Sequence, residues 1–571
     1  MWQEGGYFTP KINSTKKPYT IILPLPNAND PMHMGHALFT VQDILIRYHR
    51  MLGDPTLWLP GGDHAGIETQ FVFEKHLAKE DKSRFDFDRE TLYQMIWNFA
   101  NKNKDINKNQ MKRLGFSLDW TRYHYSLEPK IVKMVIRTFI NLYKDDLVYR
   151  GKKIVNYCPK CGTAFSDLEV DRVERADNLY YIKYPKVDGS GFITIATTRP
   201  EPIFADTHLA TNPKDKKNAH LVGTRIKNPL TDKEMGIIGD ELIDPKFGTG
   251  VVKLTPAHDF ADFEVAQKYN LPIIEAITRE GRISPNGGKY AGMKLKEARE
   301  AVLKDLTEKG LIEKIDKNYR HIVGLCYRCK SVIEPLTSEQ WFIRTKPLAE
   351  PAIKAVKEGK TKIVPKKLFE KMYFNWLENI RDWNVSRQIV WGVRIPAWYC
   401  QADQEVIVSG SEPKACPKCG QKNFVPETDT FDTWFLSGQW PVNSLKSRPG
   451  DFEYFYPTSV LDTLWDILFF WVARMMMLGI YLTGEVPFKT VHIHSRVVDE
   501  QGQKMSKSKG NVINPIEMVD KYGADALRMA LVFSVAPTSD IVISDDKVRA
   551  MRNFANKLWN IARFIVTLIH I

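Results

Sequence analysis

The stretch Tyr19–Leu38, YTIILPLPNANDPMHMGHAL, decides the fold. Its first six residues form a short apolar run, which is typical of a buried strand. A polar loop follows, and a helical pattern of apolar residues then extends from Met34 to Met51. A strand, a loop and a helix in this order open a parallel α/β unit. The next predicted strand ends in a glycine-rich turn, LWLPGGDHAG, at residues 57–66.

Composition indicates a globular protein of several domains. The chain has 571 residues, of which 43% are hydrophobic and 26% are charged, and this balance excludes bulk disorder. The net charge of +13 suits a polyanionic partner, although an ordinary basic protein explains it equally well. The longest apolar stretch, Leu464–Leu482, contains Asp466 and Arg474. We therefore expect a buried helix there, no membrane span, and a cytoplasmic protein.

The pattern of elements changes along the chain. Residues 172–322 contain many short strands and turns, which predict an inserted mixed α/β domain. The α/β pattern of residues 1–171 resumes in residues 323–490. Residues 491–546 contain a loop rich in glycine and lysine, and residues 547–571 form an amphipathic helix.

Two segments carry residues that suit attack of a carboxylate on the α-phosphate of ATP. His33 and His36 lie at the start of the first helix, where imidazoles can donate to phosphate oxygens. Lys504 and Lys507 lie in a loop flanked by glycines, which can close over a triphosphate. Each motif alone is more often a pair of helix residues or a solvated charged loop. Together, each after a predicted strand, they are far more specific.

These segments, LPLPNANDPMHMGHAL and DEQGQKMSKSKGNVINP, resemble the HIGH and KMSKS signatures of class I aminoacyl-tRNA synthetases. The resemblance implies a doubly wound, parallel-sheet, Rossmann-like catalytic domain that uses ATP with Mg²⁺ as substrate. The residues that it assigns to ATP binding are His33, Gly35, His36, Lys504, Ser506 and Lys507, with the two histidines and the two lysines acting in catalysis.

Further segments resemble the valine-specific members of this family. They are WLPGGDHAGIETQ, NYCPKCGTAFSDLEV, SRQIVWGVRIPAWYC, FDTWFLSGQWP and YPTSVLDTLWDILFFWVARMM. The resemblance implies an amino-acid site whose residues are Pro24, Asn27, Asp63, Trp434 and Trp471, with Asp63 receiving the ammonium. The two tryptophans could equally be core aromatic residues.

Three positions depart from the pattern of the family. Leu25, Gly62 and Leu464 stand where proline, threonine and glycine are usual.

The inserted segment resembles the editing domain of these enzymes. An apolar pocket rejects an isostere with an added hydroxyl only weakly, and discrimination of valine from threonine by valyl-tRNA synthetases is a well-known case. The resemblance assigns the hydrolytic site to Thr197, Thr198, Arg199, Lys253, Asp259 and Asp262, with water as the nucleophile. Asp262 would bind the ammonium of threonine, although the two aspartates could simply begin a helix. Pro202 replaces the last threonine of the TTRPET motif.

Six of the seven cysteines form three C-x-x-C pairs, which favour zinc over disulfides. The pairs Cys158/Cys161 and Cys326/Cys329 flank the inserted segment, and the four thiolates can form one structural site if the stems meet. A second site could combine Cys400, Cys416 and Cys419 with the carboxylate of Asp403. Free reduced cysteines are the alternative.

The sequence therefore predicts a monomeric valine–tRNA ligase whose partners are valine, ATP and tRNA(Val), and which also deacylates threonyl-tRNA. An isoleucine-specific relative and a non-catalytic paralogue that only binds tRNA are the alternatives. By the same resemblance, we expect the chain to be truncated near the start of the helical anticodon-binding domain.

Overall fold

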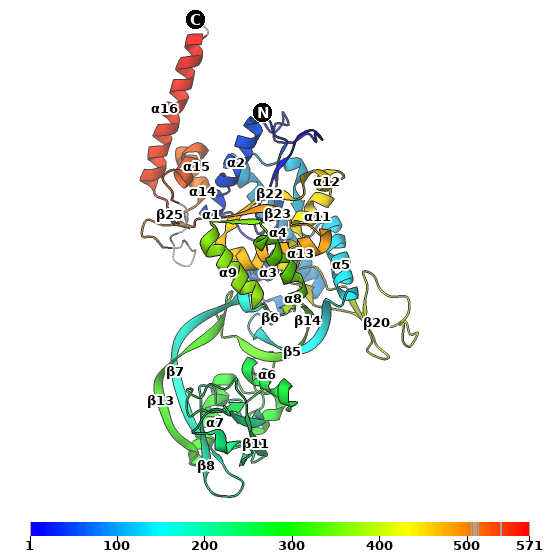
Figure 1. Ribbon diagram of the computed structural model, residues 1–571, viewed down its shortest axis with the longest axis vertical. Coiled ribbons are helices and arrows are strands. Elements are labelled where there is room, and N and C mark those ends of the chain that lie inside the picture. Colours follow the sequence, from blue (N-terminus) through cyan, green and yellow to red (C-terminus); the bar gives the residue numbers. More distant parts are fainter. Residues whose placement is uncertain (1, 504, 506–510, 512, 537–538, 570–571) are drawn as a thin grey trace. The chain divides into compact units, whose positions relative to one another are not determined.

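The computed structural model describes residues 2–503, 505, 511, 513–536 and 539–569. The chain divides into two compact units (Figure 1). The first combines Met1–Tyr149, Ile343–Val385 and Ile389–Ile571, and the second combines Arg150–Phe342 and Ser386–Gln388.

A parallel five-stranded sheet forms the centre of the first unit. Its strands, in spatial order, are β15 (Lys362–Val364), β23 (Phe488–His494), β22 (Thr458–Leu464), β1 (Tyr19–Ile22) and β2 (Thr56–Leu59). The described pairings in this sheet are all parallel. The chain proceeds from β1 to one side and later returns to the other side, so β1 lies at the point where the strand order reverses. The predicted parallel α/β class is confirmed.

The predicted helix after β1 is present, but it is interrupted. It divides into α1 (Met34–Ala37) and α2 (Thr40–Met51). The amides of Leu38 and Phe39 bond to the carbonyls of Gly35 and His36, three residues earlier. This tighter 3₁₀-type turn separates the two helices.

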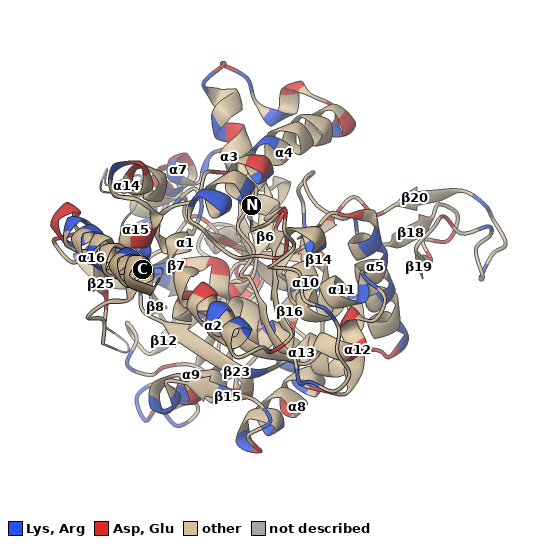
Figure 2. Cartoon of the chain, turned by 90° about the horizontal axis from the view of Figure 1, so that it is seen from above, with Lys and Arg blue, Asp and Glu red and all other residues tan. Residues whose placement is uncertain are grey.

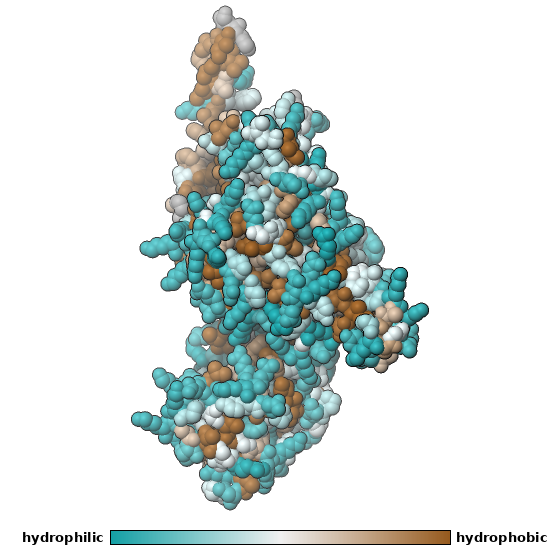
Figure 3. Space-filling model, turned by 45° about the vertical axis from the view of Figure 1, so that its right-hand side comes forward, coloured by the Kyte–Doolittle hydropathy of each residue, from teal (hydrophilic) through white to brown (hydrophobic). Residues whose placement is uncertain are grey.

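The first unit contains further helices around the sheet. They include α3 (Gly66–Ala78), α4 (Arg89–Arg113), α5 (Pro129–Lys144), α8 (Lys346–Lys357), α9 (Lys366–Glu378), α10 (Thr433–Ser437), α11 (Trp440–Lys446), α12 (Asp451–Phe455), α13 (Ala473–Thr483), α14 (Pro515–Tyr522), α15 (Ala524–Val532) and α16 (Asp545–Ile569). Figure 2 shows basic and acidic residues interspersed along these helices. Figure 3 shows hydrophobic residues gathered along α16, where Trp559 and Phe564 are exposed.

The prediction of one buried helix over Leu464–Leu482 was wrong at its start. Leu464 ends β22, a 3₁₀ turn covers Trp465–Ile467, a π-helical turn covers Leu468–Val472, and α13 follows. By length and composition alone Trp465–Thr483 could cross a membrane, but its most apolar window is 56% buried inside the fold. Arg474 lies in the core with its guanidinium over the ring of Trp383.

The second unit contains both strands and helices. A long antiparallel ribbon joins β7 (Val170–Pro185) to β13 (Ile312–Cys326), with β8 (Phe192–Thr197) beside β7. A second sheet has the order β10 (Arg225–Lys227), β11 (Glu234–Gly239), β9 (His208–Thr211) and β12 (Val251–Leu254). The helices α6 (Phe260–Tyr269) and α7 (Leu295–Glu308) belong to the same unit.

This compact unit is larger than the segment 172–322. It includes most of β5 (Val148–Cys158), β6 (Thr163–Phe165) and most of β14 (Glu334–Ile343), which lie in one sheet. Separately, in the first unit, β18 (Ala397–Cys400) lies between β19 (Val406–Val408) and β20 (Phe424–Pro426).

A buried ion pair holds the segment that lies beside the glycine-rich turn of residues 57–66. Arg122 makes two hydrogen bonds to the carboxylate of Asp451, at 2.7 and 3.0 Å, and a third to Asp119. The side chains of Arg122 and Asp451 are each only 3% exposed. Two residues after Arg122, β4 (His124–Tyr125) pairs with β3 (Gly61–Gly62).

We predict that Asp451→Asn lowers the free energy of unfolding by about 3 kcal/mol, because the buried guanidinium of Arg122 loses the negative charge of Asp451. Urea unfolding followed by tryptophan fluorescence measures this loss. Glu80→Gln, which removes an exposed ion pair with Lys82, is the control and should change stability by less than about 0.5 kcal/mol. Equal effects of the two substitutions would contradict the role of the buried pair.

Candidate functional site

The first candidate site lies where β1 and β2 end. Beyond the two strands the backbone pairing continues as an isolated bridge between Asn27 and Asp63. The amide of Ala28 bonds to the carbonyl of Asp63 at 2.9 Å, and the amide of Asp63 bonds to the carbonyl of Pro26 at 3.1 Å. The structure therefore brings two of the predicted amino-acid-binding residues side by side.

The carboxylate of Asp63 is buried and held by polar groups. Its Oδ1 accepts from the hydroxyl of Ser126 at 2.8 Å and lies 3.0 Å from Nδ1 of His64, while Oδ2 accepts from Thr433 at 3.1 Å. Burial acts to raise the pKa of Asp63, but the hydrogen bonds from His64 and Ser126 outweigh it, and the net pKa is lowered. An anionic carboxylate of this kind is suited to an ammonium group.

The two histidines of the HMGH segment cap α1 reciprocally. Nδ1 of His33 accepts from the amide of Gly35 at 3.1 Å, and Nδ1 of His36 accepts from the amide of His33 at 3.1 Å. Because Nδ1 accepts in both rings, the proton of each neutral imidazole lies on Nε2, where it can be donated. Burial, followed by the neighbouring His33, holds the pKa of His36 well below its usual range. His36 can therefore act as a neutral donor.

Gly35 is required by close packing. A Cβ at this position would lie 2.8 Å from Cε1 of His33, so a side chain would displace the ring. Because α1 has only four residues, its dipole is small. Hydrogen-bond donation to a phosphate would therefore depend mainly on the imidazoles.

The other predicted amino-acid-binding residues lie in the first unit. Pro24 follows β1, and Trp434 follows Thr433, whose hydroxyl bonds to Asp63. Trp471 is 2% exposed, and its indole N–H bonds to the carbonyl of Ser437 at 3.0 Å. This burial agrees with the alternative of a core aromatic residue, and the role of Trp471 as a pocket wall stays a prediction.

Two of the departures have local explanations. A Cβ at Gly62 would lie 2.4 Å from the hydroxyl oxygen of Tyr123, so the larger threonine does not fit beside this tyrosine. Leu464 has φ −81° and ψ 149°, an ordinary extended conformation that needs no glycine.

Lys504, Ser506 and Lys507 lie outside the described residues. Asp499 lies at the start of the loop that contains them and accepts from the amides of Gln501 and Gln503. Its other oxygen accepts from the side-chain amide of Asn511 at 2.6 Å. This aspartate therefore joins the two ends of the loop.

The second candidate site lies in the second unit, around the start of α6. Asp259 caps the helix by accepting from the amides of Ala261 and Asp262. Asp262 is instead half-buried, and its Oδ2 accepts from the amide of Thr255 at 2.8 Å. Burial, and then the charge of Asp259, raise the pKa of Asp262 to about 7, against the opposing effect of Lys253. The structure thus groups Lys253, Asp259 and Asp262.

The remaining predicted residues of this site lie at the end of β8. Thr197 ends the strand, Thr198 follows it, and the amide of Arg199 bonds to the hydroxyl of Thr197 at 3.0 Å. The guanidinium of Arg199 pairs with Glu334 at 2.6 Å and with Glu201 at 3.1 Å. These two carboxylates occupy Arg199, so its contacts here are structural ion pairs.

Both cysteine clusters converge. In the second unit the sulfurs of Cys158 and Cys329 are 3.4 Å apart, and those of Cys161 and Cys326 are 3.8 Å apart. Within the four-residue group the possible ligand atoms all lie within 4.8 Å of one another. A tetrahedral zinc with Zn–S bonds near 2.3 Å places its sulfurs about 3.8 Å apart. The donor set therefore fits zinc.

The second cluster has the mixed donor set predicted from the sequence. Cys400 and Cys419 have sulfurs 3.5 Å apart, and the sulfur of Cys416 lies 3.6 Å from Oδ2 of Asp403. A hydrogen bond from the Glu405 amide, followed by one from Cys400, lowers the pKa of Asp403 to about 2. The aspartate thus stands as an anionic fourth donor.

Comparison with known proteins agrees with the geometry. A family model described as tRNA synthetases class I (I, L, M and V) matches residues 1–544. The chain belongs to this family.

The similar curated proteins include valine–tRNA ligases. That of Dehalococcoides mccartyi (strain ATCC BAA-2266 / KCTC 15142 / 195) is 48% identical over 568 residues, which cover 99% of this chain and 64% of that protein. That of Clostridium perfringens (strain 13 / Type A) has the same identity and coverage. The chain thus spans 64% of the length of these relatives.

Two solved synthetases share the fold. The LeuRS of Agrobacterium radiobacter K84, in a ternary complex with tRNA and LeuAMS, is 18% identical, with a TM-score of 0.54 over 98% of this chain and 74% of that chain. Mycobacterium tuberculosis methionyl-tRNA synthetase bound by methionyl-adenylate is 13% identical, with a TM-score of 0.51 over 94% of this chain and 68% of that chain.

Sequence reasoning missed the partners of Asp63. Ser126 is 63 residues away from it, and Thr433 is 370 residues away. Thr433 lies in the segment FDTWFLSGQWP, next to Trp434, but its hydroxyl was not assigned to the site, and Ser126 lies outside the quoted segments.

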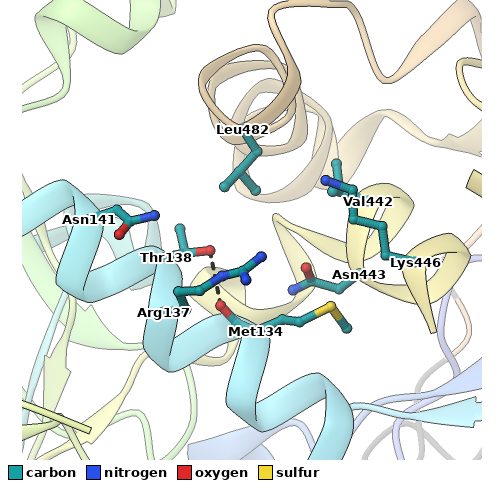
Figure 4. A pocket seen from close by; sticks show the side chains of 8 residues that line it. All are labelled: Met134, Arg137, Thr138, Asn141, Val442, Asn443, Lys446 and Leu482. Atoms are coloured by element: carbon teal, nitrogen blue, oxygen red, sulfur yellow. Dashed lines mark hydrogen bonds between the residues drawn. The ribbon is translucent and has the colours of Figure 1, made fainter.

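A separate pocket of about 280 Å³ lies among α5, α11 and the end of α13 (Figure 4). Arg137, Lys446 and Asn443 point into it. Its lining contains no carboxylate and none of the predicted site residues, so it is distinct from both candidate sites.

Proposed function

We propose that the chain is the catalytic and editing part of a valine–tRNA ligase. It would activate valine with ATP and Mg²⁺, transfer it to the 3′ end of tRNA(Val), and hydrolyse misacylated threonyl-tRNA. One observation carries the first activity: an anionic, buried Asp63 and the histidines His33 and His36, whose Nδ1 atoms accept backbone hydrogen bonds, follow the ends of adjacent parallel strands. The proposal includes a cytoplasmic monomer.

The first step needs donors and orientation rather than a protein nucleophile. A carboxylate oxygen of valine attacks the α-phosphorus of ATP, the bond from this phosphorus to the bridging oxygen breaks, and pyrophosphate leaves. Charge builds up on the phosphate oxygens, where Nε2–H donors of His33 and His36 would stabilise it. Lys504 and Lys507 would contribute cations from the KMSKS loop. Asp63 would hold the ammonium of valine.

In the second step the terminal ribose hydroxyl of tRNA(Val) attacks the carbonyl carbon of the adenylate, and AMP leaves. Pro24, Asn27, Trp434 and Trp471 would shape the side-chain pocket. The segments around Asn27 and Trp434 favour valine over the alternative, isoleucine. The non-catalytic alternative is disfavoured because the HMGH and KMSKS segments are both intact.

For editing, residues 172–322 of the second unit would form the hydrolytic domain. Water would attack the ester carbonyl of threonyl-tRNA, and Asp262 would hold the ammonium of threonine. Thr197, Thr198, Arg199, Lys253 and Asp259 complete the proposed site, while Pro202 lacks the hydroxyl that the motif usually provides there. Residues 547–571 would begin the anticodon-binding domain.

We predict that valine supports ATP–pyrophosphate exchange more strongly than isoleucine or threonine. His36→Asn should lower kcat about 100-fold, because it replaces a donor of the transition state. Asp105→Asn, an exposed change on α4, is the control and should leave exchange unaltered. Strongest exchange with isoleucine would overturn the valine assignment, and no exchange by the folded protein would favour the non-catalytic alternative.

The two cysteine clusters are proposed to hold structural zinc. Cys158 and Cys161 would bind it with Cys326 and Cys329 at the stem of the second unit. Bound zinc would supply a tetrahedral cross-link between β5 and β13, which end at Cys158 and Cys326.

Metal analysis of the purified protein is expected to find between one and two zinc equivalents. Asp403→Ala should reduce the content by up to one equivalent and leave the first site loaded, because three thiolates bind less tightly than a complete donor set. Cys161→Ser should remove zinc from the first site and lower the melting temperature. A metal-free protein with unchanged melting in Cys161→Ser would contradict both assignments.

A further inference from the structure

A buried carboxylate, Asp206, lies beneath the proposed editing residues and belongs to none of the motifs. Its side chain is fully buried. The hydroxyl of Tyr184 donates to Oδ2 at 2.6 Å, and the hydroxyl of Thr255 donates to Oδ1 at 2.5 Å. The ammonium nitrogen of Lys253 lies 3.4 Å from the same Oδ1. Asp206 is therefore the shared partner of two hydroxyls and one cation.

Thr255 links this carboxylate to Asp262. Its hydroxyl bonds to Asp206 and accepts from Lys253, while its backbone amide bonds to Oδ2 of Asp262. Two carboxylates thus lie near a single lysine. The lysine side chain is 12% exposed and is paired with Asp206.

We propose that Asp206 is a positioning residue for hydrolysis of the misacylated ester. It holds the ammonium of Lys253 and the hydroxyl of Thr255, so that the carboxylate of Asp262 is left for the ammonium of the substrate. This inference rests on the proposed editing function. Threonine esterified to tRNA keeps its ammonium free and would present it to Asp262.

Lys253 could pair with Asp262 instead of Asp206, which explains why Asp206 is needed to hold the lysine. If Lys253 were released from Asp206, it would pair with Asp262, the other nearby carboxylate. This pair would compete with the ammonium of the substrate for Asp262. The charged groups that act on Asp262 are Asp259, Lys253 and Asp206. Loss of the Asp206 charge and approach of Lys253 both favour the ionised form of Asp262, so both changes lower its pKa.

Asp206→Asn tests this arrangement, because it keeps the size and an acceptor but removes the charge. Asp240→Asn is the matched control: Asp240 is also a buried aspartate of the second unit, paired with Lys268 at 2.7 Å. Three experiments are made on the whole chain. The first gives KM and kcat for deacylation of threonyl-tRNA(Val), the second gives the pKa of Asp262 by ¹³C NMR, and the third gives the rate of valine-dependent pyrophosphate exchange.

For Asp206→Asn we expect KM to rise about tenfold, kcat to change little, and the pKa of Asp262 to fall from about 7 by about one unit, which corresponds to a tenfold change in proton affinity. Adding Lys253→Gln to this variant should reverse part of the fall in the pKa of Asp262, because the approaching cation is gone. The Asp240→Asn control should match the parent in all three measurements.

Unchanged KM and an unchanged Asp262 titration in Asp206→Asn would overturn the inference. If the parent does not deacylate threonyl-tRNA, the editing proposal fails, while the NMR titration still decides whether Asp206 directs Lys253 away from Asp262. If Asp206→Asn does not fold, Tyr184→Phe removes one hydrogen bond from the same carboxylate. It leaves the charge of Asp206 and its pair with Lys253 in place, so the pKa of Asp262 should stay close to that of the parent, and a fall of about one unit would overturn the inference.

Discussion

The parallel pairing of β1 with β2 is the constraint on which the first site depends. Tyr19 pairs with Thr56 and Ile22 with Leu59, and the same direction continues into the bridge between Asn27 and Asp63. Parallel strands end at one edge of a sheet, so the residues after them converge there. A buried glutamine, Gln42 of α2, reinforces this edge by bonding to Trp58 of β2 and to Asp462 of β22.

The two proposed ammonium sites differ in the way in which their carboxylates are held. Asp63 receives hydroxyl and imidazole hydrogen bonds that outweigh burial and keep its pKa low. Asp262 is half-buried near a second carboxylate, and its pKa is about 7. The first carboxylate is therefore charged over the whole physiological range, while the second gains its charge as pH rises through neutrality. Editing would consequently depend more on pH than activation does.

Local patterns in the sequence were sufficient for part of this structure. The apolar run YTIILP, the loop and the following helix appear as predicted, because each depends on neighbours in the chain. The four cysteines Cys158, Cys161, Cys326 and Cys329 also converge. Sequence reasoning failed at Leu464, since a continuous apolar run does not distinguish the end of a buried strand from the start of a helix.

Contacts through space were not accessible from the sequence. Ser126 and Thr433 reach Asp63 from distant segments. Asp206 lies just before β9 and reaches Lys253 of the neighbouring strand β12, in a register that the sequence did not reveal. Such residues carry ordinary polar side chains in ordinary contexts. Only the fold brings them to a site.

The central claim is that Asp63 receives the ammonium of valine at the edge where β1 and β2 end. Calorimetric titration of the chain with valine tests it most directly, comparing the parent with Asp63→Asn and with the exposed control Asp105→Asn. The account predicts that Asp63→Asn weakens valine binding about 30-fold or more, as expected for loss of a buried charge partner worth at least 2 kcal/mol, while the control binds normally. An unchanged Kd in a folded Asp63→Asn protein would contradict it.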